Sequence, residues 1–125
     1  MTRALAAFLV SALLLAGCTA EPPTFAEWET VWNDALTALP DYTGDPIPEE
    51  ACTAALVTLR ELAPELESTP DNSLDGVVNQ WLDIAEEAMF ECPPRQLGAA
   101  SFEEAYAEMH LLEQEVAAVL DQKRE

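Results

Sequence analysis

Cysteine, histidine and carboxylate side chains are the groups in this sequence that could carry chemistry. The chain has three cysteines, one histidine and 24 acidic residues. Cys52 and Cys92 do not form a Cys-x-x-Cys pair, the spacing typical of redox dithiols, so we expect them to form a structural disulfide. His110 is the single histidine. Because zinc sites gather several cysteine or histidine ligands, the sequence predicts no metal site, and it shows no signature of a cofactor.

One acidic segment has a spacing that could bind calcium. Residues 71–76, Asp-Asn-Ser-Leu-Asp-Gly, resemble the first half of an EF-hand loop, with oxygen ligands at positions one, three and five and glycine at six. Position twelve, which should supply a bidentate carboxylate, is Leu82. We therefore expect Asp71 or Ser73 to cap a helix and Asp75 to lie in its first turn. The Asp71–Asp75 segment is kept as an alternative cation-binding site.

The remaining candidates are carboxylates and tryptophans. General acid–base catalysis needs two carboxylates in unlike environments around a pocket, and the acidic residues mostly fall off the apolar stripes, so the pattern selects no pair. No nucleophile elbow, phosphate loop or dinucleotide fingerprint is present. The sequence therefore predicts no catalytic residue and a protein that is not an enzyme. Trp28 and Trp32 share a helix face with Phe25; we expect core positions, and they are ligand-binding candidates if this helix docks loosely.

Four amphipathic segments must position these residues. The first begins with a capping box, Thr24 to Glu27, and its apolar stripe ends at Pro40. The second begins near Pro46 or Pro48, and Pro64 kinks or ends it, although Glu65 and Leu66 could prolong the pattern. The third carries apolar residues from 74 to 89, and the fourth runs from a second capping box, residues 101–104, to residues 123–124. No alternating strand pattern occurs, so the sequence predicts an all-α fold, a four-helix up-and-down bundle over residues 24–125.

The two cysteines fit this arrangement. If the second and third helices form an antiparallel hairpin that turns near Pro70, Cys52 and Cys92 lie at similar distances from the turn. They therefore meet at one end of the bundle. In an exported protein such a pair is expected to oxidise, and the bond would staple a small core.

The N-terminus has the features of an export signal. Residues 1–17 place Arg3 before an uncharged apolar run, Ala4 to Ala16, and end in small residues. A helix of this run spans roughly 20 Å, which is shorter than the ~30 Å hydrocarbon core of a bilayer. We therefore expect residues 1–17 to be a cleaved signal peptide.

The segment Leu15-Ala16-Gly17-Cys18 resembles the lipobox of bacterial lipoproteins. This resemblance covers residues 1–18. It implies that the Cys18 thiol receives a diacylglycerol with fatty acyl chains such as palmitate, that residues 1–17 are removed, and that residues 18–23 form a lipidated tether. The expected location is the extracytoplasmic face of the cell membrane. In composition, the whole chain also resembles the small acidic lipoproteins of high-GC Gram-positive bacteria.

Charge narrows the class of partner. Five basic residues stand against 24 acidic ones, a formal net charge of −19, which disfavours binding to nucleic acid. The sequence predicts a non-enzymatic, lipid-anchored module that contacts a protein of the cell envelope through an acidic face. The alternative is a module that binds a small ligand or cation between the first and last helices, using Trp28 and Trp32 or the Asp71–Asp75 segment. A tryptophan-lined cavity above about 300 Å³ would favour this alternative.

Overall fold

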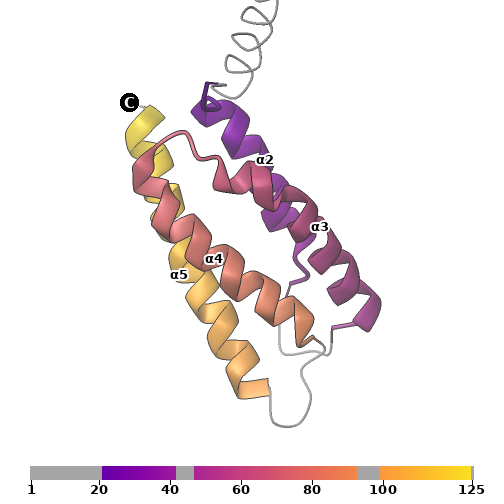
Figure 1. Cartoon of the computed structure of the whole chain (residues 1–125). Coiled ribbons are helices and arrows are strands. Elements are labelled where there is room, and N and C mark those ends of the chain that lie inside the picture. Colours follow the sequence, from indigo (N-terminus) through magenta and orange to yellow (C-terminus); the bar gives the residue numbers. More distant parts are fainter. Residues whose placement is uncertain (1–20, 42–46, 93–98, 125) are drawn as a thin grey trace, which may run out of the picture.

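A computed structural model describes residues 21–41, 47–92 and 99–124 of the chain (Figure 1). These residues form four helices and no strand, which confirms the all-α fold. The helices are α2 (Phe25–Ala38), α3 (Glu49–Glu67), α4 (Asn72–Phe90) and α5 (Ala99–Arg124).

Each helix runs antiparallel to the next. The start of α2 meets the end of α3, where Trp28 Nε1 donates to the carbonyl oxygen of Leu66 at 3.0 Å. The start of α4 meets the end of α5, where Lys123 Nζ lies 3.3 Å from Asp71 Oδ2. Together with the disulfide between α3 and the end of α4, these contacts confirm the up-and-down bundle (Figure 1).

The predicted first capping box is present. The Thr24 hydroxyl accepts from the backbone N–H of Glu27 at 3.1 Å, and the Glu27 carboxylate accepts from the backbone N–H of Thr24 at 3.5 Å. Two donors that the helix itself cannot satisfy are thus paired. α4 begins as expected with Asp71 as its N-cap, whose carboxylate accepts from the Ser73 backbone N–H.

The structure decides one helix bound that the sequence left open, the end of α3, and corrects another, the start of α5. α3 continues through Pro64 to Glu67, because the last turn is held by tertiary contacts: Leu66 is fully buried and its carbonyl accepts from Trp28. α5 begins at Ala99, so Ser101 lies inside the helix and not at its N-cap. Alanine is the strongest helix former, and the two alanines before Ser101 extend the helix backwards.

The core is built around α4, which lies between α3 and α5. Its buried residues cover two adjoining faces of the helix, whereas α2, α3 and α5 each bury a single stripe. The largest fully buried side chains come from all four helices: Trp28, Trp81, Leu59, Leu66, Leu74, Met89, Met109, Val78 and Val116. No charged side chain in the described part of the chain is buried.

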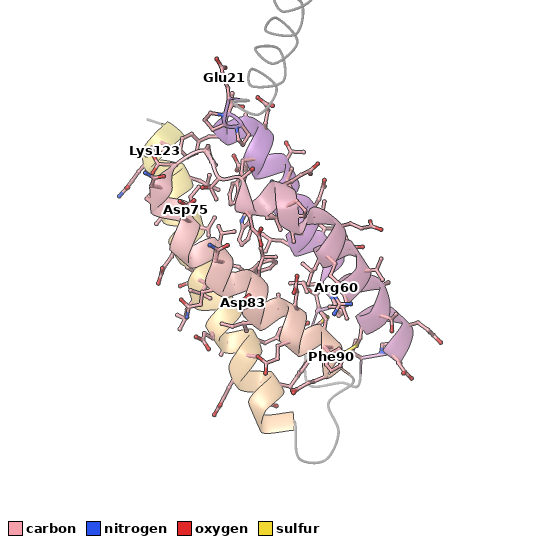
Figure 2. The ribbon with its side chains drawn as sticks, viewed as in Figure 1. Glu21, Arg60, Asp75, Asp83, Phe90 and Lys123 are labelled. Carbon is pink, nitrogen blue, oxygen red and sulfur yellow. A yellow bond between two sulfur atoms is a disulfide. The ribbon has the colours of Figure 1, made fainter. Side chains whose placement is uncertain are left out.

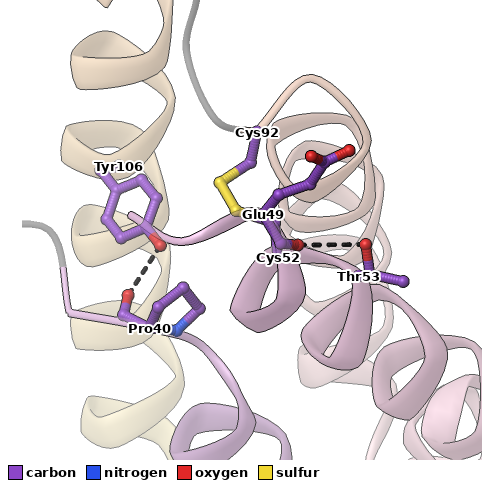
Figure 3. The surroundings of a disulfide bond; sticks show 6 residues. All are labelled: Pro40, Glu49, Cys52, Thr53, Cys92 and Tyr106. Atoms are coloured by element: carbon purple, nitrogen blue, oxygen red, sulfur yellow. Dashed lines mark hydrogen bonds between the residues drawn. A yellow bond between two sulfur atoms is a disulfide. The ribbon is translucent and has the colours of Figure 1, made fainter. Parts of the chain in front are cut away.

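The disulfide closes the end of the bundle opposite Glu21. Cys52 in the first turn of α3 is bonded to Cys92, just after α4, with their Cα atoms 5.7 Å apart (Figure 3). Both cysteines are buried. The predicted pairing and the predicted hairpin register are therefore confirmed.

Replacing both Cys52 and Cys92 by alanine should lower the free energy of unfolding by about 4 kcal/mol. The bond joins residues 40 positions apart, and its loss restores the chain entropy of that loop to the unfolded state. Urea unfolding of the oxidised protein and the variant measures the difference. Wild-type protein kept reduced is the control and should unfold at the same urea concentration as the variant. Equal midpoints for oxidised and reduced wild type would contradict the prediction.

Candidate functional site

The two tryptophans predicted as ligand-binding candidates lie in the core. Trp28 is 1% exposed and Trp32 is 3% exposed, and their rings stack with centroids 5.6 Å apart. Trp32 also meets Trp81 of α4 edge-on at 4.7 Å. The indole N–H of Trp28 donates to Leu66, whose carbonyl belongs to the last turn of α3 and lacks an intrahelical donor. Trp28 is thus committed to the fold.

A shallow groove separates α2 from α5, the first and last described helices. This α2–α5 groove has a volume of about 220 Å³. It is lined by Glu29, Trp32, Asn33 and Leu36 of α2 and by Glu113, Ala117, Leu120 and Asp121 of α5. The structure therefore places a hollow where the ligand-binding alternative expects one. Its volume is below the ~300 Å³ typical of a drug-sized site, so only a small group fits.

A larger hollow borders Trp28 on the other side of α2. It has a volume of about 510 Å³ and lies between the start of α2 and the end of α3, lined by Glu21, Pro23, Glu27, Trp28, Val31, Pro64, Glu65 and Ser68. Trp28 contributes almost no exposed surface to it, and Glu27 is engaged in the capping box. This hollow is a gap between the start of α2 and the end of α3, and it offers no unused aromatic face.

Asp71 and Asp75 stabilise the start of α4. Asp71 accepts from the Ser73 backbone at 2.9 Å and from the Ser73 hydroxyl at 2.7 Å, and it pairs with Lys123. Asp75 accepts from the Thr69 hydroxyl. Residues 72–76 are helical, so they do not form a loop that could wrap a calcium ion. The expected capping role of Asp71 is confirmed.

A second polar network links α5 to the rest of the bundle. Glu113 accepts from Trp81 Nε1 at 3.0 Å, and its other carboxylate oxygen lies 3.4 Å from His110 Nδ1. The Tyr106 hydroxyl donates to the carbonyl of Pro40 at 2.8 Å (Figure 3). Burial, with Asp41 and Glu113 nearby, raises the pKa of Tyr106 to about 12, so this donor stays protonated at neutral pH. His110, the single histidine, is exposed and serves as a surface partner of Glu113.

Sequence reasoning did not single out an acidic groove between α4 and α5. This α4–α5 groove has a volume of about 200 Å³ and apolar residues at its base. Its acidic lining residues are Glu87 of α4, Glu91 at the C-cap of α4, and Glu104 and Glu108 of α5. Each pair is spaced four residues apart and therefore lies on one helix face. That spacing is visible in the sequence, but only packing brings the two pairs together.

The remaining expectations concern the N-terminus, metal binding and membrane-spanning segments. Cys18 and the signal segment lie outside them. Within them, no group of three or more histidine, cysteine or acidic side chains could hold a metal ion. No described helix is both long and apolar enough to span a bilayer. Comparisons with protein-family models, with curated proteins and with solved structures gave no match for this chain.

Replacing Asp71 by asparagine should destabilise the protein at neutral pH, and the difference should disappear as the pH falls to about 2. The backbone and hydroxyl of Ser73, followed by Lys123, lower the pKa of Asp71 from 3.8 to about 2. A carboxylate with a lowered pKa stabilises the fold above its ordinary pKa and loses that effect as pH falls through the folded value. Asparagine keeps the capping acceptor, so the variant isolates the charge.

Thermal melts across this pH range test the prediction. Asp83→Asn changes an exposed carboxylate elsewhere on α4 and is the matched control. It should leave the melting temperature unchanged or raise it slightly, because it relieves repulsion among the acidic residues. The same pH dependence for both variants would contradict a special role for Asp71.

Proposed function

We propose that this protein is an extracytoplasmic lipoprotein whose acidic helical domain binds another component of the cell envelope. The observation that carries the proposal is the lipobox resemblance at Cys18, joined to a disulfide in the folded domain. Disulfides persist in oxidising compartments outside the cytosol, so the Cys52–Cys92 bond supports export independently of the N-terminal pattern. In this proposal, lipid on Cys18 holds the domain at the membrane.

The bundle presents one end to the anchor and the other to the surroundings. Glu21 and Lys123 lie at the same end, and Phe90 lies at the opposite end, near the disulfide (Figure 2). Residues 19–23 reach at most roughly 18 Å. Because the domain is strongly acidic, an anionic leaflet repels it within about one Debye length, ~8 Å at physiological salt. The disulfide end is therefore the part that we expect to reach a partner.

The acidic surface is complementary in charge to a partner with basic groups. Of the five basic residues in the chain, the structure describes the side chains of Arg60 and Lys123, and Lys123 is paired with Asp71. The α4–α5 groove gathers four carboxylates toward the disulfide end, the end at which Phe90 is 73% exposed. An exposed aromatic ring beside carboxylates offers apolar contact and charge to the same partner.

The engagement of the polar aromatic groups in the fold favours binding over catalysis. Trp28, Trp81 and Tyr106 each donate a hydrogen bond that ties two parts of the bundle together. The aromatic groups with polar atoms are thus largely engaged in holding the fold. The carboxylates that line the grooves are the groups that reach solvent, and their common property is negative charge. The α2–α5 groove additionally favours the second candidate function, the capture of a small cation.

Replacing Cys18 by alanine should abolish membrane association. The diacylglyceryl group attaches to this thiol in the lipoprotein family, and two or more acyl chains are needed for stable anchoring. Cell fractionation and intact mass measure the effect: wild type should be membrane-bound and heavier than residues 18–125 by the lipid. The Cys52→Ala/Cys92→Ala variant is the control and should remain at the membrane. An unmodified, soluble wild-type protein would contradict the proposal.

Capture from detergent-solubilised envelopes tests the interaction. We expect a basic partner that is retained at physiological salt and released near 1 M salt, where screening shortens to ~3 Å. Replacing the four glutamates of the α4–α5 groove by glutamine removes their charge and should prevent capture. These residues are Glu87, Glu91, Glu104 and Glu108. A matched control neutralises four exposed glutamates of α3, namely Glu50, Glu61, Glu65 and Glu67, and should capture normally. Absence of a salt-sensitive partner, or loss of capture in the α3 variant alone, would contradict the proposed acidic face.

A further inference from the structure

Trp32 carries a polar atom that the fold does not use. Among the described residues, the indole N–H of Trp28 bonds to Leu66 and that of Trp81 bonds to Glu113, whereas that of Trp32 makes no hydrogen bond. Trp32 is nevertheless 3% exposed. No side-chain nitrogen or oxygen in the described part is both fully buried and unpaired. The Trp32 N–H therefore retains access to solvent, and Trp32 borders the α2–α5 groove.

The residues around this N–H supply negative charge and an apolar wall. Acidic residues line the groove from both helices, Glu29 from α2 and Glu113 and Asp121 from α5, and none of its lining residues is basic. Glu113 is held in place by Trp81, so its charge is fixed beside the groove. Leu36, Ala117 and Leu120 supply the apolar wall. The site can thus attract a cation, shelter a short aliphatic chain and donate one hydrogen bond.

We propose that the α2–α5 groove binds a small organic cation that carries a hydrogen-bond acceptor, the chemistry of a lysyl or arginyl residue. The carbonyl of such a group accepts from Trp32 Nε1, its aliphatic chain lies against Leu36 and Leu120, and its charged end meets the carboxylates. The volume of about 220 Å³ suits one residue and not a larger ligand. This binding site lies apart from the α4–α5 groove and does not depend on the lipid anchor.

Three probes separate the contributions of charge and acceptor. Nα-acetyl-lysine amide has both, pentylamine has the charge without the acceptor, and Nα-acetyl-norleucine amide has the acceptor without the charge. Titration calorimetry on the lipidated protein in detergent micelles should give the tightest binding for the lysine probe. Each of the other two should bind at least about tenfold more weakly, because each lacks either the hydrogen bond or the charged contact. Equal affinity for all three probes would overturn the proposal.

Nuclear magnetic resonance locates the bound probe. The indole N–H resonance of Trp32 should move on addition of the lysine probe, while that of Trp28 stays in place because it is bonded to Leu66, which does not line the groove. A shift of Trp28 without one of Trp32, or no indole shift at saturation, would overturn the site.

A matched pair of α5 variants tests the groove itself. Ala117→Leu places a larger side chain in the groove, and Ala118→Leu makes the same change at the next exposed residue, which does not line it. Both exchange one strong helix former for another, so both should fold. Ala117→Leu should weaken binding of the lysine probe at least tenfold, and Ala118→Leu should leave it within about twofold. Equal binding by both variants would overturn the proposal, whatever the outcome of envelope capture.

Discussion

The structure depends on burying three tryptophans in a small domain while pairing the indole N–H groups of Trp28 and Trp81. Trp28, Trp32 and Trp81 form one continuous contact from α2 to α4. At one end of it Trp28 bonds to the last turn of α3, and at the other Trp81 bonds to α5. These side chains therefore join all four helices through both apolar area and directed hydrogen bonds. A buried indole without an acceptor would cost the desolvation of its N–H, so helix positions are tightly restricted.

The disulfide complements this aromatic contact from one end of the bundle. The Trp28–Leu66 hydrogen bond and the Lys123–Asp71 pair lie toward the Glu21 end of the bundle, whereas Cys52 and Cys92 join α3 and α4 at the opposite end. A small domain buries a limited fraction of its surface, and a covalent link adds stability that its core cannot supply. The acidic residues stay outside this framework: no described charged side chain is buried, so their repulsion acts at the surface.

Most helix positions could be predicted because they depend on local pattern. The capping box at Thr24 and the capping role of Asp71 follow from side chains that reach backbone groups within a few residues. The sequence left the bound near Pro64 open, and the start of the last helix was predicted too late, at Ser101. Whether a helix continues past a proline depends on burial of the turn beyond it, here Leu66, and that burial exists only after α2 packs on α3. The α4–α5 groove escaped prediction for the same reason, since it is lined by residues of two helices.

The sequence by itself determined the helical class, the antiparallel order and the disulfide pairing, because periodicity, turn residues and cysteine positions are local or nearly local quantities. It also determined the overall charge. Only the tertiary structure decided which of two neighbouring tryptophans on one helix face keeps a usable polar atom. Trp28 lies beside the end of α3 and donates its N–H to the Leu66 carbonyl. Trp32, one turn further, lies against Trp81 and borders the groove beside α5. Residues one helical turn apart have the same pattern in sequence, but they meet different neighbours once the helices cross.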